Sequence, residues 1–443
     1  MRIGALLALA ALLNAAAPAA SAAPVVMISI DGLRPADVID APKRGLKVPN
    51  LRALLAHGAH ATGVRNTLPT VTYPDHTTLV TGAWPSVHGV TGNTVFDPLK
   101  KNMDGWYWYA RDVKVEGLWE EVHKAGFKTA SVNWPVTVGH DFIDYNIPEF
   151  WRSFYPPEDA KLLEAVSTRG LLDELSRVGG TPEESLIGEE PQNDQARTNI
   201  AVALIALKHP KFMTLHLTAL DHNEHMFGPG SKEANAVLEK LDAQIGEVVA
   251  ASRRSAPDVV IALVSDHGFA PVEHDVNLMI AFAQAGLVTL DPDTHKPTAW
   301  QAEPWNAGGS AAVMLARPGD ATLKAKVKAL LDKLAAAPAN GIAAVIDRAA
   351  IAKAGGGVEP SFWIDFKIGY ETGGKTTGPL VTAGSNKGTH GYFPTHPEMR
   401  ATFMLDGTAK KGSLGEIDMI DIAPTLAKIL GVPLPQATGK PLF

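Results

Sequence analysis

Three apolar runs in this chain each lead into an aspartate, and this arrangement constrains the fold more than any other feature. The runs are residues 25–30 before Asp31, residues 212–220 before Asp221 and residues 259–265 before Asp266. Runs this apolar and rich in β-branched residues are typical of strands buried on both faces of a parallel sheet. Open α/β sheets bind their ligands beyond the carboxyl ends of the strands. The sequence therefore predicts three carboxylates, distant along the chain, at one edge of a sheet.

Strand-like and helix-like patterns alternate along most of the chain. We expect strands at 129–132 and 258–264 besides the first two runs, and helices at 49–57, 77–80, 114–125, 157–176, 193–207 and 231–252. Such alternation predicts an α/β fold with a mostly parallel, doubly wound sheet and helices on both faces.

The pattern becomes less regular around residues 276–380. Strands are expected there at 313–315 and 362–368, and a helix at 321–336. A last helix is expected at 417–430 and should pack back on the core. We find no internal repeat and no low-complexity linker, so we expect one catalytic domain over residues 23–443 with an inserted cap region.

Residues 1–22 have the pattern of a secretory signal peptide. Arg2 is their only charged residue, the apolar segment 4–13 is too short to span a bilayer, and Ala20-Ser21-Ala22 is a small-residue cleavage site. A buried N-terminal helix is the alternative. The signal peptide predicts a periplasmic or secreted protein.

Charge and cysteine content exclude several classes of protein. The chain has 443 residues, a formal net charge of -7 and no cysteine. The acidic balance, without any long run of Lys or Arg, argues against a nucleic-acid scaffold or a protein that binds anionic membranes. Without cysteine there is no disulfide and no lipoprotein anchor. No other segment is long and apolar enough for a membrane anchor.

Histidines accompany two of the three aspartates. His225 follows Asp221 by four residues, and His267 follows Asp266 directly. His390 lies in a glycine-containing segment, Gly388-Thr389-His390-Gly391-Tyr392. Carboxylate and imidazole are the ligands of catalytic zinc-type sites. Each group alone could also be a solvated or structural set of side chains, but together they predict a metal centre.

The segment 69–93 supplies a candidate nucleophile. Pro74 suits a first helical turn, so Thr72 should lie at a helix N-terminus, where free N–H groups and the helix dipole favour negative charge. A hydroxyl bound there to a metal can ionise and attack. A plain N-cap is the alternative role for Thr72.

These motifs together resemble the nucleotide pyrophosphatase/phosphodiesterase family of the alkaline phosphatase superfamily, in its bacterial, type I phosphodiesterase-like form. The resemblance runs from Met27 to the last residues. It is carried by Ile28-Ser29-Ile30-Asp31-Gly32-Leu33-Arg34, Thr72-Tyr73-Pro74, Thr81-Gly82, His88-Gly89, Asn93 and residues 420–434. It implies an alkaline-phosphatase-like three-layer sandwich.

The resemblance also implies a cofactor and a role for each site residue. Two Zn²⁺ ions are expected, the first held by Asp31, Thr72, Asp266 and His267, the second by Asp221, His225 and His390. Thr72 would be the nucleophile. Asn93 would bind the phosphoryl oxygens, and Tyr73 would stack on a nucleobase. The other twelve of the fifteen histidines, including His76, His88, His222 and His396, are expected to be structural or exposed.

The chain departs from the family pattern at two places. Asp75 stands where the family usually has Asn, which would put an extra carboxylate near the nucleophile. His222, Asn223 and Glu224 replace the usual small residues between Asp221 and His225. His222 or Glu224 could support a ligand or narrow the pocket. Neither departure removes a ligand.

The expected function is hydrolysis of phosphodiester or pyrophosphate bonds in a small-molecule substrate through a phospho-threonine intermediate, and nucleotides are the expected substrates. An alkaline phosphatase-type phosphomonoesterase or a phosphonate hydrolase is the alternative. Related monoesterases hold the extra phosphate charge with a Lys-x-Arg pair, and none lies between Asn93 and Asp221, which favours a diester. Arg152 is the nearest basic residue in an aromatic setting, and Phe150, Trp151 or Tyr155 could form the second wall of a base pocket. A non-catalytic binding protein would need a broken ligand set, and all seven ligand positions hold competent residues.

Overall fold

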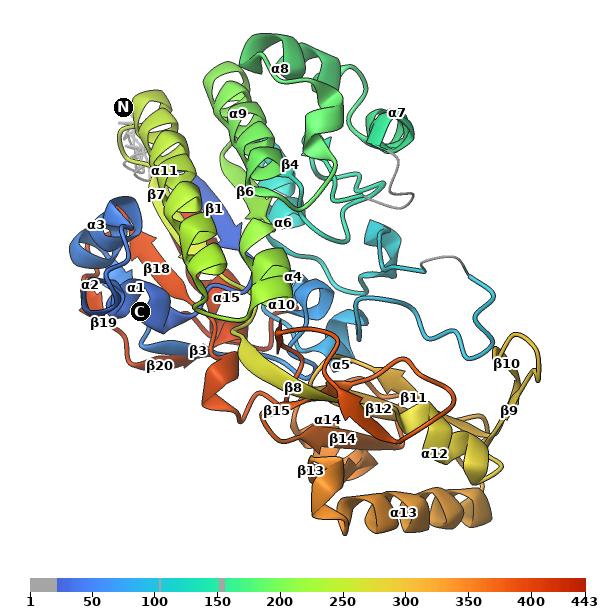
Figure 1. Ribbon diagram of the computed structural model, residues 1–443. Helices are drawn as coiled ribbons and strands as arrows, with labels where there is room; N and C mark the ends of the chain where they lie inside the picture. The colour runs from blue at the N-terminus through green and yellow to red at the C-terminus, as the bar shows by residue number, and fades with distance from the viewer. Residues whose placement is uncertain (1–21, 103–104, 151–155) are drawn as a thin grey trace, which may run out of the picture.

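A mostly parallel sheet of eight strands forms the centre of the molecule in the computed structural model, which describes residues 22–102, 105–150 and 156–443 (Figure 1). Its five parallel strands are β7, β1, β6, β4 and β5, and antiparallel β18 with β2 and β19 extends one edge. In sheet order the strands are β19 (Gly412–Ser413), β2 (Ala59–His60), β18 (Phe403–Asp406), β7 (Val260–Val264), β1 (Val25–Ile30), β6 (Phe212–Leu217), β4 (Thr129–Val132) and β5 (Tyr145–Ile147).

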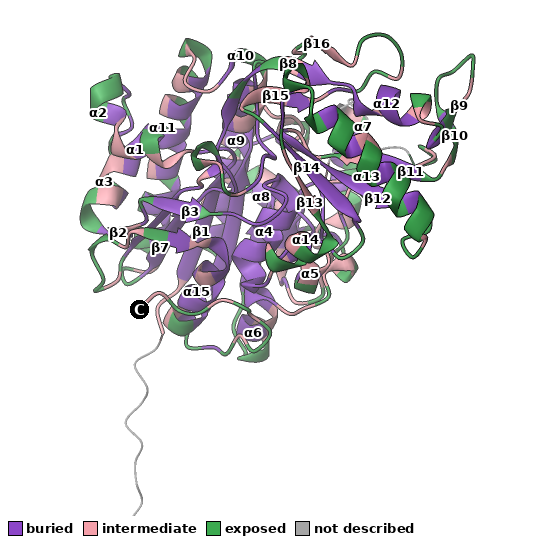
Figure 2. Ribbon diagram, turned by 90° about the horizontal axis from the view of Figure 1, so that it is seen from below, coloured by how far each residue is buried: buried purple, intermediate pink, exposed green. Residues whose placement is uncertain are grey.

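Helices cover both faces of this sheet, because the side chains of each strand alternate between two apolar cores. In β1, Val26, Ile28 and Ile30 face one core, while Val25 and Met27 face the other. The first core is closed by α3 (Pro49–His57), α8 (Leu171–Gly179), α9 (Pro191–Lys208) and α11 (Lys232–Ser255). The second is closed by α4 (Thr72–Thr81), α6 (Leu118–Lys124) and α15 (Ile422–Leu430). In Figure 2 the central strands are coloured as buried, whereas several helices around them carry exposed residues. The expected three-layer α/β fold is confirmed.

Residues 270–389 build a second region beside the carboxyl edge of the sheet, visible at the lower right of Figure 1. Its antiparallel sheet has the order β11 (Ala302–Asn306), β12 (Ser310–Leu315), β14 (Phe362–Phe366) and β13 (Ile342–Asp347). Helices α12 (Leu278–Gln284) and α13 (Ala321–Ala335) pack on it around a core of its own. Strand β8 (Ala270–Val276) leads into this region and pairs with β15 (Gly369–Thr372), β16 (Val381–Ala383) and β17 (Gly388–Thr389). We refer to residues 278–366 as the cap.

The remaining elements are short or lie at the periphery. They are α1 (Pro35–Ile39), α2 (Ala41–Arg44), β3 (Gly63–Arg65), α5 (Pro85–His88), α7 (Pro156–Val166), α10 (Ala219–Phe227), β9 (Val288–Leu290), β10 (Pro297–Trp300), α14 (Arg348–Lys353) and β20 (Glu416–Asp418). None of the helices in the described residues combines the length and the apolarity needed to cross a lipid bilayer.

Several expected elements differ in their boundaries, and for three of them the structure shows the cause. The run 212–220 is a strand only to Leu217, because the chain turns into α10 at Ala219. The helix expected over 157–176 is two helices, since Gly170 adopts a left-handed conformation (φ 72°) between α7 and α8. The last helix begins at Ile422 rather than at 417, because residues Glu416–Asp418 pair with β3 as a strand. Most of the expected signal peptide, residues 1–21, lies outside the described residues.

Candidate active site

The three aspartates meet at the carboxyl edge of three neighbouring strands. Strands β7, β1 and β6 are adjacent and parallel, with Ser29 opposite both His216 and Val264. Asp31 follows β1 directly, Asp266 lies two residues after β7, and Asp221 is in the first turn of α10, just beyond β6. The prediction that sheet topology gathers these carboxylates is confirmed by their positions.

Helix α10 is fixed by a buried carboxylate from α9. Asp194 accepts hydrogen bonds from the backbone N–H groups of Thr218 (3.2 Å) and Ala219 (2.8 Å), which would otherwise be unpaired at a helix start. Asp221 and His225 are one turn apart on this helix, so their side chains point to the same side.

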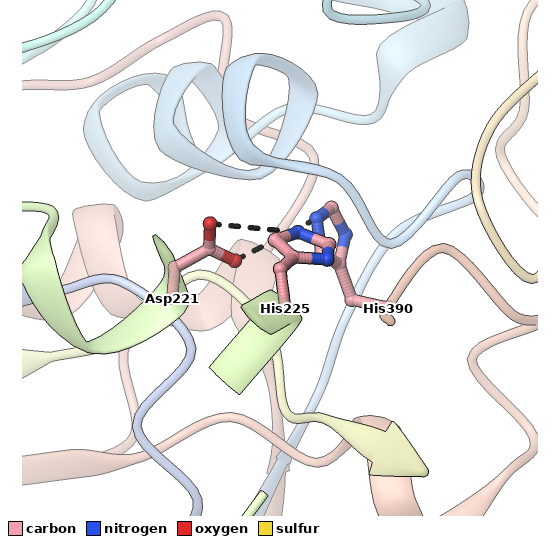
Figure 3. Close-up of side chains that lie close together, drawn as sticks. All are labelled: Asp221, His225 and His390. Atoms are coloured by element: carbon pink, nitrogen blue, oxygen red, sulfur yellow. Dashed lines mark ion pairs between the residues drawn. The ribbon is translucent and has the colours of Figure 1, made fainter. Parts of the chain in front are cut away.

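Three imidazoles converge on the aspartates. His225 Nε2 is 3.5 Å and His390 Nε2 is 3.7 Å from the Asp221 carboxylate. Dashed lines mark both contacts in Figure 3. His267 Nε2 is 3.4 Å from Asp31 Oδ1 and 3.2 Å from Asp266 Oδ2. The rings of His267 and His390 stack with centroids 3.7 Å apart.

The opposite nitrogen of each ring fixes its tautomer. Nδ1 of His225 faces the carbonyl of Gly388 (3.0 Å), Nδ1 of His267 faces that of Gly268 (3.2 Å), and Nδ1 of His390 faces that of Thr70 (3.0 Å). A carbonyl only accepts, so each Nδ1 must donate its proton. In the neutral ring Nε2 then carries a lone pair directed toward the carboxylates, which is the orientation a metal ligand requires.

Glycines let the His390 loop approach its neighbours closely. Gly391 has φ +84°, and a Cβ there would lie 1.7 Å from the carbonyl oxygen of Ala307 in the cap. A Cβ on Gly388 would lie 2.6 Å from the carbonyl oxygen of Glu224. The loop therefore packs closely between α10 and the cap. This close packing brings His390 next to Asp221.

The electrostatics of the cluster are those of a site that needs a cation. Burial, with the charge of Asp266 next, raises the pKa of Asp31 and of Asp221 well above their ordinary values. Burial lowers the pKa of His225, and lowers those of His267 and His390 well below the usual range. Neutral imidazoles whose lone pairs face carboxylate oxygens repel them unless a cation lies between.

The residues present fit a metal ion. Asp31 Oδ1, Asp221 Oδ1, Asp266 Oδ2 and His267 Nε2 are buried and have no hydrogen-bond partner. Ligand atoms lie within 4.8 Å of one another in two groups, Asp221 with His225 and His390, and Asp31 with Asp221 and His267. Asp221 belongs to both groups, whereas the family resemblance assigned Asp221 to the second zinc ion alone. Asp266 is outside the second group, yet its Oδ2 faces His267.

Thr72 and Asn93 lie beside these groups. Helix α4 begins at Thr72, as predicted, and Thr72 is 9% exposed in a cavity of about 200 Å³ that it shares with Asp31, Asp221, His225 and His390. The Asn93 Oδ1 accepts a hydrogen bond from the backbone N–H of Tyr73 (2.9 Å). The side-chain amide N–H₂ of Asn93 is therefore left as a donor beside the cavity.

Tyr73 lies in a different setting from the one the sequence suggested. It borders the same cavity, but it is 1% exposed and its hydroxyl donates to Glu149 Oε1 (2.8 Å). The half-buried Trp106 lies against it, with ring centroids 5.2 Å apart, and also borders the cavity. Phe150 packs on Trp108 instead, while Trp151, Arg152 and Tyr155 are outside the described residues.

Sequence reasoning missed His216 and Glu149. His216 is fully buried in β6, where Nε2 lies 3.1 Å from Asp31 Oδ2 and Nδ1 lies 2.8 Å from Glu149 Oε2. Burial lowers the pKa of His216, but the hydrogen bond and charge of Glu149 outweigh it, and the net shift is upward. A histidine inside the apolar run that precedes Asp221 was the available signal for His216. Glu149 had none, because it lies in a loop after β5.

The two departures from the family pattern also have places in the structure. Asp75 is fully buried and turns away from the cavity to accept from the Thr67 hydroxyl (2.7 Å). Glu224 faces Arg34 (3.4 Å), whereas His222 borders the cavity with Glu189 3.5 Å away. Of the two candidate residues, His222 is thus the one at the cavity.

The other named histidines are structural. His76 is fully buried, receives a hydrogen bond from Ser29, and its pKa is lowered to about 3 by burial. His88 is equally buried beside Thr78, and His396 pairs with Asp365 (2.7 Å).

Comparison with known proteins identifies a matching family profile and similar sequences. The sequence profile of the family described as type I phosphodiesterase/nucleotide pyrophosphatase matches residues 25–393. A pyrophosphatase/phosphodiesterase of Schizosaccharomyces pombe, itself uncharacterised, is 27% identical over 56% of this chain and 45% of its own length. Family member 1 of the ectonucleotide pyrophosphatase/phosphodiesterases from Mus musculus is 27% identical over 55% of this chain and 24% of its own. The match thus spans less than half of each relative.

Solved structures share the fold. Murine ectonucleotide pyrophosphatase/phosphodiesterase 5 superposes with a TM-score of 0.65 at 18% identity, covering 94% of this chain and 97% of that one. An inactive variant of the murine protein in complex with AMP gives a TM-score of 0.66 with the same coverage.

Proposed function

The chain belongs to the type I phosphodiesterase/nucleotide pyrophosphatase family, and we propose that it hydrolyses phosphodiester or pyrophosphate bonds of nucleotides with two bound zinc ions and a phospho-threonine intermediate. One observation carries the proposal. Three imidazoles direct Nε2 at carboxylates of the aspartate cluster, beside a threonine at a helix N-terminus. That arrangement suits a metal-assisted nucleophile.

Two sets of side chains would hold the ions. Asp31, Thr72, Asp266 and His267 would form one set, and Asp221, His225 and His390 the other. The zinc ions, when bound, would lower the pKa of the Thr72 hydroxyl and offset charge on the phosphoryl oxygens. The tautomers fixed by the carbonyls of Thr70, Gly268 and Gly388 support this assignment.

The chain's own residues would carry the two displacements. Thr72 Oγ would attack phosphorus as its proton passes to solvent. The bond from Oγ to phosphorus forms, the bond to the leaving oxygen breaks, and that oxygen takes up a proton from water. Water then attacks the same phosphorus, the bond to Oγ breaks, and the proton released by water returns to Thr72. The Asn93 amide, held by the Tyr73 N–H, would donate to a phosphoryl oxygen in both steps.

The charges around the cavity favour a diester over a monoester. Among the described residues that border it, Arg197 is the one Lys or Arg. Its guanidinium donates hydrogen bonds to Asp194 (2.6 Å), to Thr218 (2.8 Å) and to two backbone carbonyls. A monoester dianion would find no free cationic side chain in that set.

Export is part of the same proposal. The pattern of residues 1–22 supports secretion to the periplasm or the medium. Residues 23–443 would then be the mature catalytic domain, with the cap as its insert.

Replacing Thr72 with alanine tests the nucleophile. We expect Thr72→Ala to lower kcat on a nucleotide diester by at least ~10³-fold, because the attacking oxygen is gone. Zinc content should stay near the wild-type value, since the carboxylates and imidazoles remain. Turnover retained at the wild-type level with full metal content would rule out the phospho-threonine intermediate.

A further inference from the structure

An ion pair joins the two chain segments that carry Asp31 and Asp221. Arg34 Nη2 lies 3.4 Å from Glu224 Oε1. Arg34 follows Asp31 by three residues, while Glu224 follows Asp221 by three residues and directly precedes His225. The contact therefore links the end of β1 to helix α10. In the proposed assignment these two segments supply ligands to different metal ions.

Glu224 depends on Arg34 for its charge. Within the described part of the chain, Arg34 is the one cationic partner of Glu224. Glu224 is 1% exposed, and its Oε2 has no hydrogen-bond partner. Burial raises the pKa of Glu224, and the charge of Arg34 opposes that shift more than any other group. Because a buried carboxylate without a cation is costly, this contact ties Glu224, and with it α10, to Arg34.

Arg34 is itself held in place. Its Nε and Nη2 each donate to one carboxylate oxygen of Asp37 (2.9 Å), in the paired geometry that guanidinium and carboxylate groups favour. Arg44 also pairs with Asp37, and it reaches Asn235 of α11 (3.4 Å). Two positive and two negative side chains thus balance each other in this network. Glu224 is attached to an anchored guanidinium and not to a free surface side chain.

The two segments also approach each other closely at the backbone. A Cβ added to Gly32 would lie 3.5 Å from the Cα of Asp221. On another side of α10, the backbone N–H of Lys387 donates to the carbonyl of His225 (2.8 Å). Helix α10 is therefore held between the loop after β1 and the loop before His390. A shift of this helix would change the distance between the ligand groups.

The ion pair lies outside the chemistry itself. Neither Arg34 nor Glu224 borders the cavity that Thr72 shares with the ligand groups, and neither is an expected ligand. The pair can therefore affect the reaction only by placing other groups. Glu224 is also one of the residues at which the chain departs from the family pattern, so its ion pair is not part of that pattern.

We propose that Arg34 and Glu224 are positioning residues, whose contact sets the spacing of the two metal-ligand groups and thereby the affinity for the second metal ion. This inference rests on the proposed two-metal function. The second ion is the sensitive one, because two of its three expected ligands, Asp221 and His225, are on α10. Asp221 is also within reach of both ligand groups, so its position affects both.

Stepwise zinc affinity, measured on the full chain by competition with chelators, tests the proposal. We expect Glu224→Gln and Arg34→Met each to weaken the binding of one zinc ion about 10–100-fold, the range for lost contacts behind a metal ligand. The affinity for the other ion should stay close to that of wild type, because most of its expected ligands are outside α10. Zinc affinities that match wild type in both variants would overturn the proposal.

Arg44→Met is the matched control. Arg44 pairs with Asp37, as Arg34 does, but it forms no ion pair with Glu224 among the described residues. Both zinc affinities of this variant should match wild type. A loss as large as in Arg34→Met would assign the effect to Asp37 and overturn the proposal.

The double variant Arg34→Met/Glu224→Gln tests whether the two residues act as a pair. It removes both charges, so it leaves no unpaired buried charge and keeps the test valid if a single variant fails to fold. Its loss of zinc affinity should be close to that of either single variant. Losses that multiply would mean that the two residues act independently, against the proposal.

Manganese substitution separates positioning from general destabilisation. Two Mn²⁺ ions about 4 Å apart couple magnetically, and EPR spectroscopy detects the coupling. At full manganese occupancy we expect the coupled spectrum in wild type and Arg44→Met, and weaker coupling in Glu224→Gln. A wild-type protein that binds no second ion contradicts the proposed function. A coupled wild type whose spectrum is unchanged in Glu224→Gln overturns this inference alone.

Discussion

His216 shows how a side chain outside the expected ligand set can organise the site, because it contacts the expected ligand Asp31. It is buried between Asp31 and Glu149, and Glu149 also accepts from Tyr73. The imidazole of His216 therefore orients the Asp31 carboxylate, and the Glu149 carboxylate orients that imidazole. Such supporting contacts fix the direction of a ligand's lone pairs and its basicity.

Removing this support should weaken metal binding. We expect His216→Phe to reduce zinc affinity about 10–100-fold, the range for lost contacts behind a metal ligand. Competition with a chromophoric chelator measures the affinity directly. His88→Phe is a matched control, since His88 is as buried but contacts Thr78 and Val90. Equal zinc affinity in His216→Phe and wild type would mean that His216 only fills space.

At the scale of elements, loops joined to strand ends position the ligands. Two hydrogen bonds hold the segment after His390 against Asp365 of β14. His396 Nε2 lies 2.7 Å from Asp365 Oδ2, and Asp365 Oδ1 accepts from the backbone N–H of Phe393 (3.1 Å). The hydrogen bond to Asp365 raises the pKa of His396, against its partial burial.

This pair should make stability depend on pH in a defined direction. A histidine whose folded pKa lies above its unfolded value of about 6.5 stabilises fully below that pH, and the contribution is lost as pH rises through the folded pKa. We expect wild type to exceed His396→Gln by about 1 kcal/mol in unfolding free energy at pH 6 and by less at pH 9. Urea unfolding at the two pH values measures this, and a difference that grows with pH would contradict the assigned pairing.

The elements also show where sequence reasoning succeeds. Strands β1 and β7 were predictable because continuous apolar runs are typical of buried parallel strands. The end of β6 was not, since Thr218, Ala219 and Leu220 continue the apolar run. The turn into α10 depends on Asp194 of another helix, which caps the backbone there. That contact exists only in the folded chain.

For the whole molecule, the cluster of carboxylates leads us to expect that bound metal adds to stability. Asp31, Asp221 and Asp266 lie together, and burial raises the pKa of the first two. A ligand present at 100 times its dissociation constant stabilises a folded protein by about 2.7 kcal/mol. We expect chelation to lower Tm by several degrees and added zinc to restore it.

Variants should separate this effect from general destabilisation. The response of Tm to zinc should shrink in Asp221→Asn, because Asp221 is within reach of both ligand groups. It should persist in Asp258→Asn, where the exposed aspartate is remote from the cluster. A Tm that does not respond to chelator or to zinc would refute the metal site.

The site as a whole was partly predictable. Short motifs and the ends of apolar runs pointed to eight residues that the fold brings together, namely Asp31, Thr72, Asn93, Asp221, His225, Asp266, His267 and His390. Side chains that join the site only through folding were missed, such as Glu149 from a loop and His216 from within β6. The buried setting of Tyr73 was missed for the same reason, because its partner Glu149 is distant in sequence.

The deciding measurement is a pair of rates on metal-analysed protein, with the p-nitrophenyl ester of thymidine monophosphate and with p-nitrophenyl phosphate as substrates. The Arg197 guanidinium is already hydrogen-bonded to Asp194 and Thr218, and the sequence has no Lys-x-Arg pair between Asn93 and Asp221. An unpaired phosphate charge costs several kcal/mol at a buried site. We therefore predict a kcat/KM at least ~100-fold higher for the diester. A preference for the monoester would contradict the phosphodiesterase function and identify the chain as a phosphatase of the same fold.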